Sequence, residues 1–388
     1  MRTSYRRMLA LLLVLALALV ACGDGDDATD TTAGDATPPE TGSTETTSGE
    51  EACESPDQVR LQLQWFAQAQ FAGYYAAIDQ GFYEDQCLEV EILEGGVDIV
   101  PQQVLASGGA EFGLAWVPKA LVSREAGADI INIGQTFERS GTLMVSWADS
   151  GITSPEDWEG KKVGNWGFGN EYELLAAIEM FDVQDVELVG QDFTMSALLN
   201  REIDSAEAMT YNEYAQVLEA ENPDTGELYQ PEDLSVIDFN EVGTAMLQDA
   251  VWVNADWLAD NEEIAQRFLE ASFEGWIYCR DNPDDCVQSV LDAGSTLGLS
   301  HQTWMMNEIN ALIWPATEGI GVMNEALWDQ TVEIATTQIP DLEGVEISDD
   351  VYRTDLAEAA VASLEEKGLD VHGESWERVE VELQPGGE

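Results

Sequence analysis

The stretch QLQWFAQAQFAGYYAAIDQGFY, residues 62–83, passes from a strand pattern to a helix pattern within a few residues. Apolar and polar residues alternate over 59–65, which predicts a β-strand. From 71 to 78 the apolar residues follow helical spacing, and Gly81 suits the end of that helix. Ligands of open α/β sheets bind at the carboxyl ends of strands, beside helix N-termini, so this junction is a candidate binding site.

Aromatic and amide side chains gather at this junction. Trp65, Gln68 and Gln70 lie in the expected loop, and Tyr74 lies one turn into the expected helix. A flat aromatic surface beside amide groups suits a planar, polar ligand. The alternative is that Trp65 and Tyr74 are core residues, because aromatic side chains at strand ends are often buried.

The rest of the chain continues the alternation of strands and helices. Further strands are expected at 88–93, 110–116, 129–135, 142–147, 162–165, 186–189, 206–210, 234–238 and from about 250. Helices are expected at 98–106, 119–126, 171–180, 195–200, 211–219, 262–278, 283–297, 301–312, 324–337 and 350–367. This rhythm predicts an α/β fold with largely parallel sheets and helices on both faces.

The order of the elements predicts two lobes, with the second inserted into the first. Lobe 1 is expected over 58–147 and 250–388, and lobe 2 over 148–249. Two crossing strands, near 143–152 and 245–254, would join the lobes. Two lobes joined by two segments form a hinge, so a ligand between them is enclosed when they close.

The N-terminus has the pattern of a targeting segment. Three arginines precede an apolar run over 8–20 that is too short for a stable membrane span. The run ends in LVAC, which resembles the bacterial lipoprotein cleavage box and implies that Cys22 is lipidated after removal of the residues before it. The alternative is an ordinary signal peptide with a chance cysteine. Residues 23–57 are acidic and Thr-rich, and they are expected to form a disordered tether.

Four cysteines remain after Cys22, an even set in an exported chain. Cys279 and Cys286 are close enough in sequence to join a helix-to-helix turn, and Cys53 and Cys87 could then tie the N-terminal segment to the first strand–helix unit. The sequence alone leaves this pairing open. Metal binding is the competing interpretation, but the chain has two histidines and no paired CxxC, so no metal site is expected.

The formal net charge is −61. With no basic patch to neutralise phosphates, nucleic acid is excluded as a partner. The same charge argues against an anionic ligand that is steered to the protein by electrostatic attraction. A strongly acidic surface suits solubility at high salt and a monomer, and it is also typical of a highly soluble cell-surface protein.

Several stretches together resemble one family, the solute-binding lipoproteins of ABC importers in the thiamine-pyrimidine-precursor and riboflavin-binding branch. The stretches are LQLQWFAQAQFAGYYAAIDQGFYED (61–85), GGVDIVPQQVLASGGAEFGLAW (95–116), EDWEGKKVG (156–164), GNEYELLA (169–176) and AMTYNEYAQVLE (208–219). Within the branch, QAQFAGYY, GGVDIVPQQVLASG and AMTYNE are most similar to the riboflavin-binding members. The resemblance implies the type II periplasmic-binding-protein fold, a ligand in the interlobe cleft and delivery to a membrane permease.

Five aromatic residues are candidate stacking surfaces for the ligand: Trp65, Tyr74, Trp116, Trp166 and Tyr211. Five polar residues are candidates to pair with the edge of its ring: Gln70, Asn170, Glu171, Asn212 and Glu213. Trp116 follows a strand and could equally be core. Asn170 and Glu171 have the alternative role of capping the helix that begins there, and Asp249 that of stabilising the hinge.

The leading hypothesis is a lipid-anchored protein on the extracytoplasmic face of the cell membrane. It captures a planar heterocycle, riboflavin or a thiamine pyrimidine precursor, for an ABC permease, and it needs no cofactor. One alternative is an enzyme of the same fold, related to pyrimidine-precursor synthesis. It is disfavoured because the chain lacks that branch's CCCFC motif and offers no Ser-His-Asp or Cys-His set. A cell-surface sensor is the other alternative.

Overall fold

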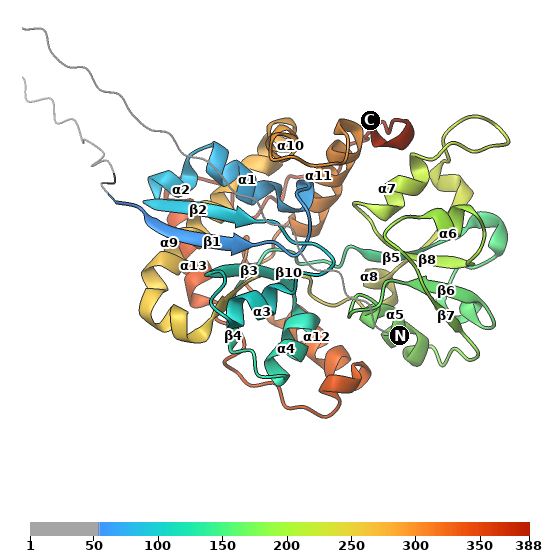
Figure 1. Ribbon diagram of the computed structural model, residues 1–388, viewed down its shortest axis with the longest axis horizontal. Coiled ribbons are helices and arrows are strands. Elements are labelled where there is room, and N and C mark those ends of the chain that lie inside the picture. Colours follow the sequence, from blue (N-terminus) through green and yellow to red (C-terminus); the bar gives the residue numbers. More distant parts are fainter. Residues whose placement is uncertain (1–52, 54) are drawn as a thin grey trace, which may run out of the picture. The chain divides into compact units, whose positions relative to one another are not determined.

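The computed structural model describes Cys53 and residues 55–388 (Figure 1). The expected leader, Cys22 and most of the expected tether lie outside the described residues. The first strand, β1 (Asp57–Gln62), begins inside the range expected for the tether. In the described part of the chain, no helix combines the length and the apolar character needed to cross a membrane.

The first sheet has five strands in the order β2-β1-β3-β10-β4. They are β2 (Leu88–Leu93), β1, β3 (Phe112–Trp116), β10 (Asp249–Asn254) and β4 (Ile130–Gln135). β1 runs parallel to β2 and β3, whereas β10 runs antiparallel to β3 and β4. This sheet and its helices are called lobe 1 below.

The second sheet also has five strands, in the order β7-β6-β8-β5-β9. They are β7 (Glu187–Gly190), β6 (Lys162–Asn165), β8 (Ser205–Met209), β5 (Thr142–Trp147) and β9 (Leu234–Asp238). β6 is parallel to β7 and β8, and β5 is antiparallel to β8 and β9. This sheet and its helices are called lobe 2.

Both sheets are therefore mixed, whereas the alternation of elements predicted largely parallel ones. Parallel neighbours require a helical crossover within the same sheet. β5 and β10 instead follow directly on a passage of the chain from the other sheet, through 136–141 and 243–248. Residues 142–147, expected in lobe 1, consequently belong to the sheet of lobe 2.

Alternate residues of the inner strand β10 face opposite helical layers. In β10, Val251 and Val253 pack into one cluster, and Ala250 and Trp252 into another. The first cluster includes residues of α1 (Ala72–Asp79), α9 (Ala255–Asp281), α10 (Pro283–Asp292), α11 (Leu299–Ile313) and α13 (Asp355–Glu366). The second includes residues of α3 (Pro101–Ala106), α4 (Val117–Glu125) and α12 (Glu325–Gln338). Helices thus cover both faces of the first sheet (Figure 1).

Lobe 2 has the same layered arrangement on a smaller scale. Helices α6 (Ser196–Leu199) and α7 (Glu213–Leu218) contribute to the cluster that contains Val145, and α5 (Tyr172–Met180) and α8 (Phe239–Val242) to the cluster that contains Met144. Of the tryptophans between residues 250 and 330, Trp252, Trp276, Trp314 and Trp328 are buried, whereas Trp257 and Trp304 are partly buried.

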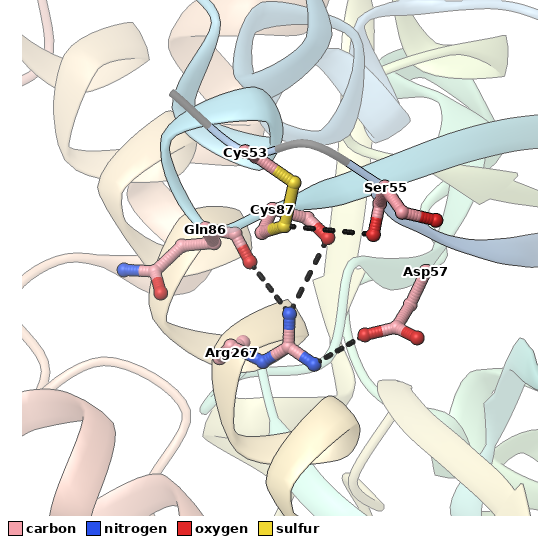
Figure 2. Close-up of a disulfide and its surroundings, with 6 residues drawn as sticks. All are labelled: Cys53, Ser55, Asp57, Gln86, Cys87 and Arg267. Atoms are coloured by element: carbon pink, nitrogen blue, oxygen red, sulfur yellow. Dashed lines mark hydrogen bonds and ion pairs between the residues drawn. A yellow bond between two sulfur atoms is a disulfide. The ribbon is translucent and has the colours of Figure 1, made fainter. Parts of the chain in front are cut away.

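Two disulfides join Cys53 to Cys87 and Cys279 to Cys286. The second connects the end of α9 to the start of α10. Figure 2 shows the first, together with Arg267 of α9. The Arg267 guanidinium donates to the carbonyl oxygens of Gln86 (2.8 Å) and Cys87 (3.3 Å) and pairs with the Asp57 carboxylate at 2.6 Å. This arrangement fastens the start of β1 to both α9 and the segment before β2.

Candidate ligand-binding cavity

A cavity of about 320 Å³ lies between residues of lobe 1 and residues of lobe 2. Lobe 1 contributes the segments that follow β1, β2 and β3, and lobe 2 those that follow β6, β7 and β8. These are the carboxyl ends of the parallel strands, where open α/β sheets bind ligands. The volume falls at the lower end of the range, about 300–1,000 Å³, that is usual for small-molecule sites.

Most of the candidate residues line this cavity: Trp65, Gln70, Trp116, Trp166, Asn170, Tyr211, Asn212 and Glu213. They come from segments up to about 150 residues apart in sequence, and the two sheets bring them together. Trp65 of lobe 1 also packs on Phe193 of lobe 2, with ring centroids 4.7 Å apart.

Tyr74 does not line the cavity. It is 2 % exposed, its hydroxyl lies 3.3 Å from Thr136 Oγ1, and its ring meets Trp276 edge to face at 5.7 Å. Its position on α1 directs the ring toward α9, which packs against α1. The structure thus places Tyr74 in the core, the alternative that the sequence had left open.

Glu171 also lies off the cavity wall. Its carboxylate accepts a hydrogen bond from the Gly169 N–H at 2.9 Å and so holds the loop before α5. The neighbouring Asn170 does line the cavity, and its Nδ2 donates to the Gly167 carbonyl at 2.8 Å.

Asp249 organises the wall of lobe 1, although it does not line the cavity itself. Its carboxylate accepts hydrogen bonds from Gln64 Nε2 (2.7 Å), Gln70 Nε2 (2.9 Å) and Trp116 Nε1 (2.8 Å). Gln68 Nε2 in turn donates to Gln70 Oε1 at 2.7 Å. Burial raises the pKa of Asp249 to about 6, and the three donors oppose that rise. One carboxylate therefore fixes three cavity-lining side chains.

On the wall of lobe 2, a chain of hydrogen bonds leads from the cavity to α11. Glu213 accepts from the Met209 N–H (3.1 Å) and from Asn212 Nδ2 (2.8 Å). Asn212 Oδ1 lies 2.9 Å from His301 Nε2, and His301 Nδ1 lies 2.9 Å from Glu219 Oε1. Burial raises the pKa of Glu213 to about 7. α11 also packs on the 3₁₀ turn Ala69–Phe71 of lobe 1, so His301 links the two lobes.

Glu207 of β8 is fully buried beneath the wall of lobe 2. One of its carboxylate oxygens accepts from the Trp166 N–H at 2.8 Å, and the other has no hydrogen-bond partner. Burial raises the pKa of Glu207 to about 8. A carboxyl group in such a place stays protonated at neutral pH, which avoids an uncompensated buried charge.

Several lining residues were not singled out from the sequence, among them Gln64, Lys119, Phe168 and Phe193. A signal did exist for Lys119, because the chain has only four lysines and this one follows an expected strand end. No comparable signal marks Phe168, an exposed phenylalanine at the mouth of the cavity. Among the described residues, no group of three or more His, Cys, Asp or Glu side chains is placed to hold a metal ion.

The chain is similar in sequence to several known proteins. The family model described as NMT1/THI5 like matches residues 68–286. The formylaminopyrimidine-binding protein of Halalkalibacterium halodurans is 24% identical over 252 residues, 64% of this chain and 73% of that protein. The riboflavin-binding protein RibY of Chloroflexus aurantiacus is 25% identical over 291 residues, 71% and 79% of the two chains.

Other relatives carry the name of an enzyme. The 4-amino-5-hydroxymethyl-2-methylpyrimidine phosphate synthase of Aspergillus parasiticus is 24% identical over 259 residues, 63% of this chain and 73% of that protein. Among solved structures, the periplasmic aliphatic sulphonate binding protein SsuA of Escherichia coli superposes with a TM-score of 0.59 at 16% identity, covering 76% of this chain and 96% of that one. This likeness shows a periplasmic-binding-protein fold.

Proposed function

Because the chain belongs to the NMT1/THI5-like family, we propose that it is the extracytoplasmic solute-binding protein of an ABC importer. The ligand is a planar heterocycle, riboflavin or a thiamine pyrimidine precursor, which the protein captures between its lobes and delivers to a permease. The cavity is the observation that carries the proposal, because it is lined by aromatic rings and amides from both lobes at the carboxyl ends of their strands.

The chemistry of the wall supports a planar ligand. Trp65, Trp116, Trp166 and Tyr211 line the cavity, and each stack of a planar ring on such a side chain contributes about 1–3 kcal/mol, as for bases on aromatic side chains. Gln64 and Gln68 supply polar groups at the same site. Two stacks and a few hydrogen bonds together supply the binding free energy of roughly 8–11 kcal/mol that a scavenging receptor needs.

The names of two relatives support the ligand class, since one is a formylaminopyrimidine-binding protein and the other a riboflavin-binding protein. The anchor is part of the same proposal. Acylation of Cys22 would hold the protein at the extracytoplasmic face of the membrane, near its permease. The strongly negative charge supports a monomer.

Titration of the purified protein with riboflavin and with 4-amino-5-hydroxymethyl-2-methylpyrimidine tests the ligand class. One of the two should quench tryptophan emission and raise the melting temperature. Trp166→Ala should weaken the binding about 5- to 150-fold, the equivalent of one stack. Trp376→Ala, a half-buried tryptophan away from this cavity, is the matched control. The ligand class is wrong if neither compound changes emission or melting.

A synthase of the same fold is the second candidate, favoured by the names of several relatives. It requires turnover rather than binding alone. Incubating the pure protein with riboflavin and with 4-amino-5-hydroxymethyl-2-methylpyrimidine, then searching for a converted compound by mass spectrometry, separates the two candidates. Turnover of either compound would replace the binding-protein proposal, and binding without conversion would support it.

A further inference from the structure

Lys119 is the only cationic side chain on the described wall of the cavity. It lies in the first turn of α4, three residues after the end of β3. The chain has four lysines, Lys119, Lys161, Lys162 and Lys367, so a lysine at this position stands out against a strongly acidic background. Its contacts indicate what it does there.

Two contacts hold the Lys119 ammonium in place. Nζ lies 4.6 Å above the Trp116 ring and donates to Asn170 Oδ1 at 2.6 Å. Asn170 belongs to lobe 2, and its other amide atom is occupied by the Gly167 carbonyl, so its oxygen is turned toward the lysine. Gly169, at φ +85°, lies beside this pair, and a Cβ there would come 2.9 Å from Tyr172 Cε2 and 3.3 Å from Lys119 Cγ.

The charges around Lys119 come from three elements. Burial lowers the pKa of Lys119 to about 8, against the opposing effect of Glu207 on β8, Glu171 before α5 and Asp249 on β10, each of which favours the charged amine when it is ionised. The amine is therefore still mostly protonated at pH 7. An ammonium has three N–H donors and no acceptor, and Asn170 is its only hydrogen-bond partner among the described residues. Two donors are left for water or for a ligand.

Gln64 and Gln68 present the opposite chemistry. Gln64 Nε2 donates to Asp249, and Gln68 Nε2 donates to Gln70 Oε1. The carbonyl oxygens of both side chains have no hydrogen-bond donor among the described residues, and both residues line the cavity. This wall thus offers strong donors at Lys119 and acceptors at the two glutamines.

We propose that Lys119 is a specificity-determining residue that donates a hydrogen bond to a ring carbonyl oxygen of the ligand. The ligand class is then an uncharged planar heterocycle with a lactam or imide edge, whose C=O faces Lys119 and whose N–H faces Gln64 or Gln68. This inference rests on the proposed function and narrows it. A cationic ring would be rejected, because a partly buried ammonium would face it.

The test compares two three-ring compounds, riboflavin, which has an imide edge, and phenazine, which has ring nitrogens but no carbonyl. The wild-type protein should bind riboflavin more tightly than phenazine. Lys119→Met should weaken riboflavin binding about 10- to 100-fold, the usual effect of losing a charge-assisted hydrogen bond, and should leave phenazine binding unchanged. Lys162→Met removes an exposed lysine remote from the cavity and should change neither affinity.

The pH profile separates a direct contact from a structural role. A carbonyl ligand binds the protonated amine, so riboflavin affinity should be highest below about pH 7 and fall as the pH rises through 8. In Lys119→Met, this decline should be absent. Lys119→Arg keeps the charge and should retain the affinity at pH 9, which also shows that the site is still folded.

The outcomes separate this inference from the proposed function. Equal riboflavin affinity in wild type and Lys119→Met overturns the role of Lys119 and leaves the proposed function standing. An aminopyrimidine without a ring carbonyl that binds more tightly than riboflavin, and independently of Lys119, overturns the ligand class alone. A wild-type protein that binds no ring compound overturns both.

Discussion

Glu207 shows how a single buried residue can control the pH dependence of the molecule. Its carboxyl group is fully buried, and one oxygen has no hydrogen-bond partner. Glu173 and Glu213 are buried in similar ways, and burial raises the pKa values of the three residues to about 8 (Glu207), 8 (Glu173) and 7 (Glu213). In the unfolded chain, each would titrate near about 4.3.

The sign of the effect follows from proton counting. Between about pH 4.5 and 8, the native state binds more protons than the unfolded state, so the free energy of unfolding falls as the pH rises. Glu207→Gln keeps an oxygen for the Trp166 N–H and removes the titration. We predict that this variant is more stable than wild type at pH 8, by about 1 kcal/mol or more, and similar to wild type at about pH 4, where the glutamate is mostly protonated in the folded and in the unfolded chain. Urea denaturation at both pH values measures this.

Glu202→Gln is the matched control, because Glu202 is an exposed glutamate in the same lobe. It should leave the slope of stability against pH as in wild type. A Glu207→Gln variant that is less stable than wild type at pH 8 would show that Glu207 is charged and paired in the native protein, contrary to the prediction.

The two aromatic residues of the opening stretch, Trp65 and Tyr74, show what could be predicted for single residues. Both follow β1, and both had the alternative of being core. The side chain of Trp65 lies in the loop and reaches the cavity, whereas that of Tyr74 points from α1 toward α9. The direction of the Tyr74 side chain depends on α9, which begins about 180 residues later in the chain. The local sequence around Tyr74 therefore cannot predict it.

At the scale of elements, the contact between α1 and α9 depends on two glycines. A Cβ on Gly275 would overlap the carbonyl oxygen of Gly73, and a Cβ on Gly73 would overlap the Trp276 ring. The helices are therefore closer together than side chains would allow. α1 follows directly on the loop that carries Trp65 and Gln70, so this packing also sets the position of one cavity wall.

We predict that Gly275→Ala lowers the free energy of unfolding by about 1–3 kcal/mol or more, because the added methyl group forces the two helices apart. Guanidinium denaturation checks this. Gly190→Ala in β7 is the control, since a Cβ there meets nothing within 4 Å, and its effect should stay within about 0.5 kcal/mol. Equal stability of Gly275→Ala and wild type would mean that the helices can separate at little cost.

The strands were predicted better than their directions. β2, β5, β6 and β9 have the bounds that were expected from the sequence. The antiparallel setting of β5 and β10 was not predicted, because it follows from the passages of the chain between the lobes and not from either strand's own pattern. Most of the candidate site residues were found because they follow predicted strands. The residues after a strand have a fixed place at the edge of an α/β sheet, so their position could be predicted.

At the scale of the whole molecule, α11 connects the lobes beside the cavity. His301 contacts Glu219 and Asn212 of lobe 2, and Trp304 Nε1 donates to the Thr210 carbonyl at 3.0 Å. His301 and Glu219 are both nearly inaccessible, at 1 % and 5 % exposure. Loss of the histidine would leave a buried carboxylate without its partner.

We predict that His301→Ala loosens the contact between α7 and α11. Amide hydrogen exchange in these two helices should become about 10-fold faster, because an unpaired buried group costs about 1–3 kcal/mol. Mass spectrometry of the exchanged peptides measures it. His372→Ala alters the other histidine, which contacts the Ala316 carbonyl in lobe 1, and should leave both helices unchanged. Unchanged exchange in His301→Ala would show that the remaining contacts, that of Trp304 with Thr210 among them, hold the two helices without the histidine.

The formal net charge of −61 belongs to the full chain, and most of the acidic residues lie in the part that the structure describes. Like charges on a compact surface repel one another more than in the unfolded chain, so the charge lowers the stability of the native state at low salt. The screening length shrinks from about 10 Å at 0.1 M salt to about 3 Å at 1 M. We therefore predict that the melting temperature rises with NaCl over this range.

Screening can be distinguished from the general stabilisation by excluded solutes. Stabilisation by excluded solutes such as sucrose does not depend on charge, whereas screening gains little once the screening length is shorter than the distance between charges. The melting temperature should thus rise steeply up to a few tenths molar NaCl and then level off, while sucrose should give no such early rise. A melting temperature that stays constant or falls with NaCl would mean that paired charges such as Arg267 and Asp57 stabilise the fold more than the repulsion weakens it.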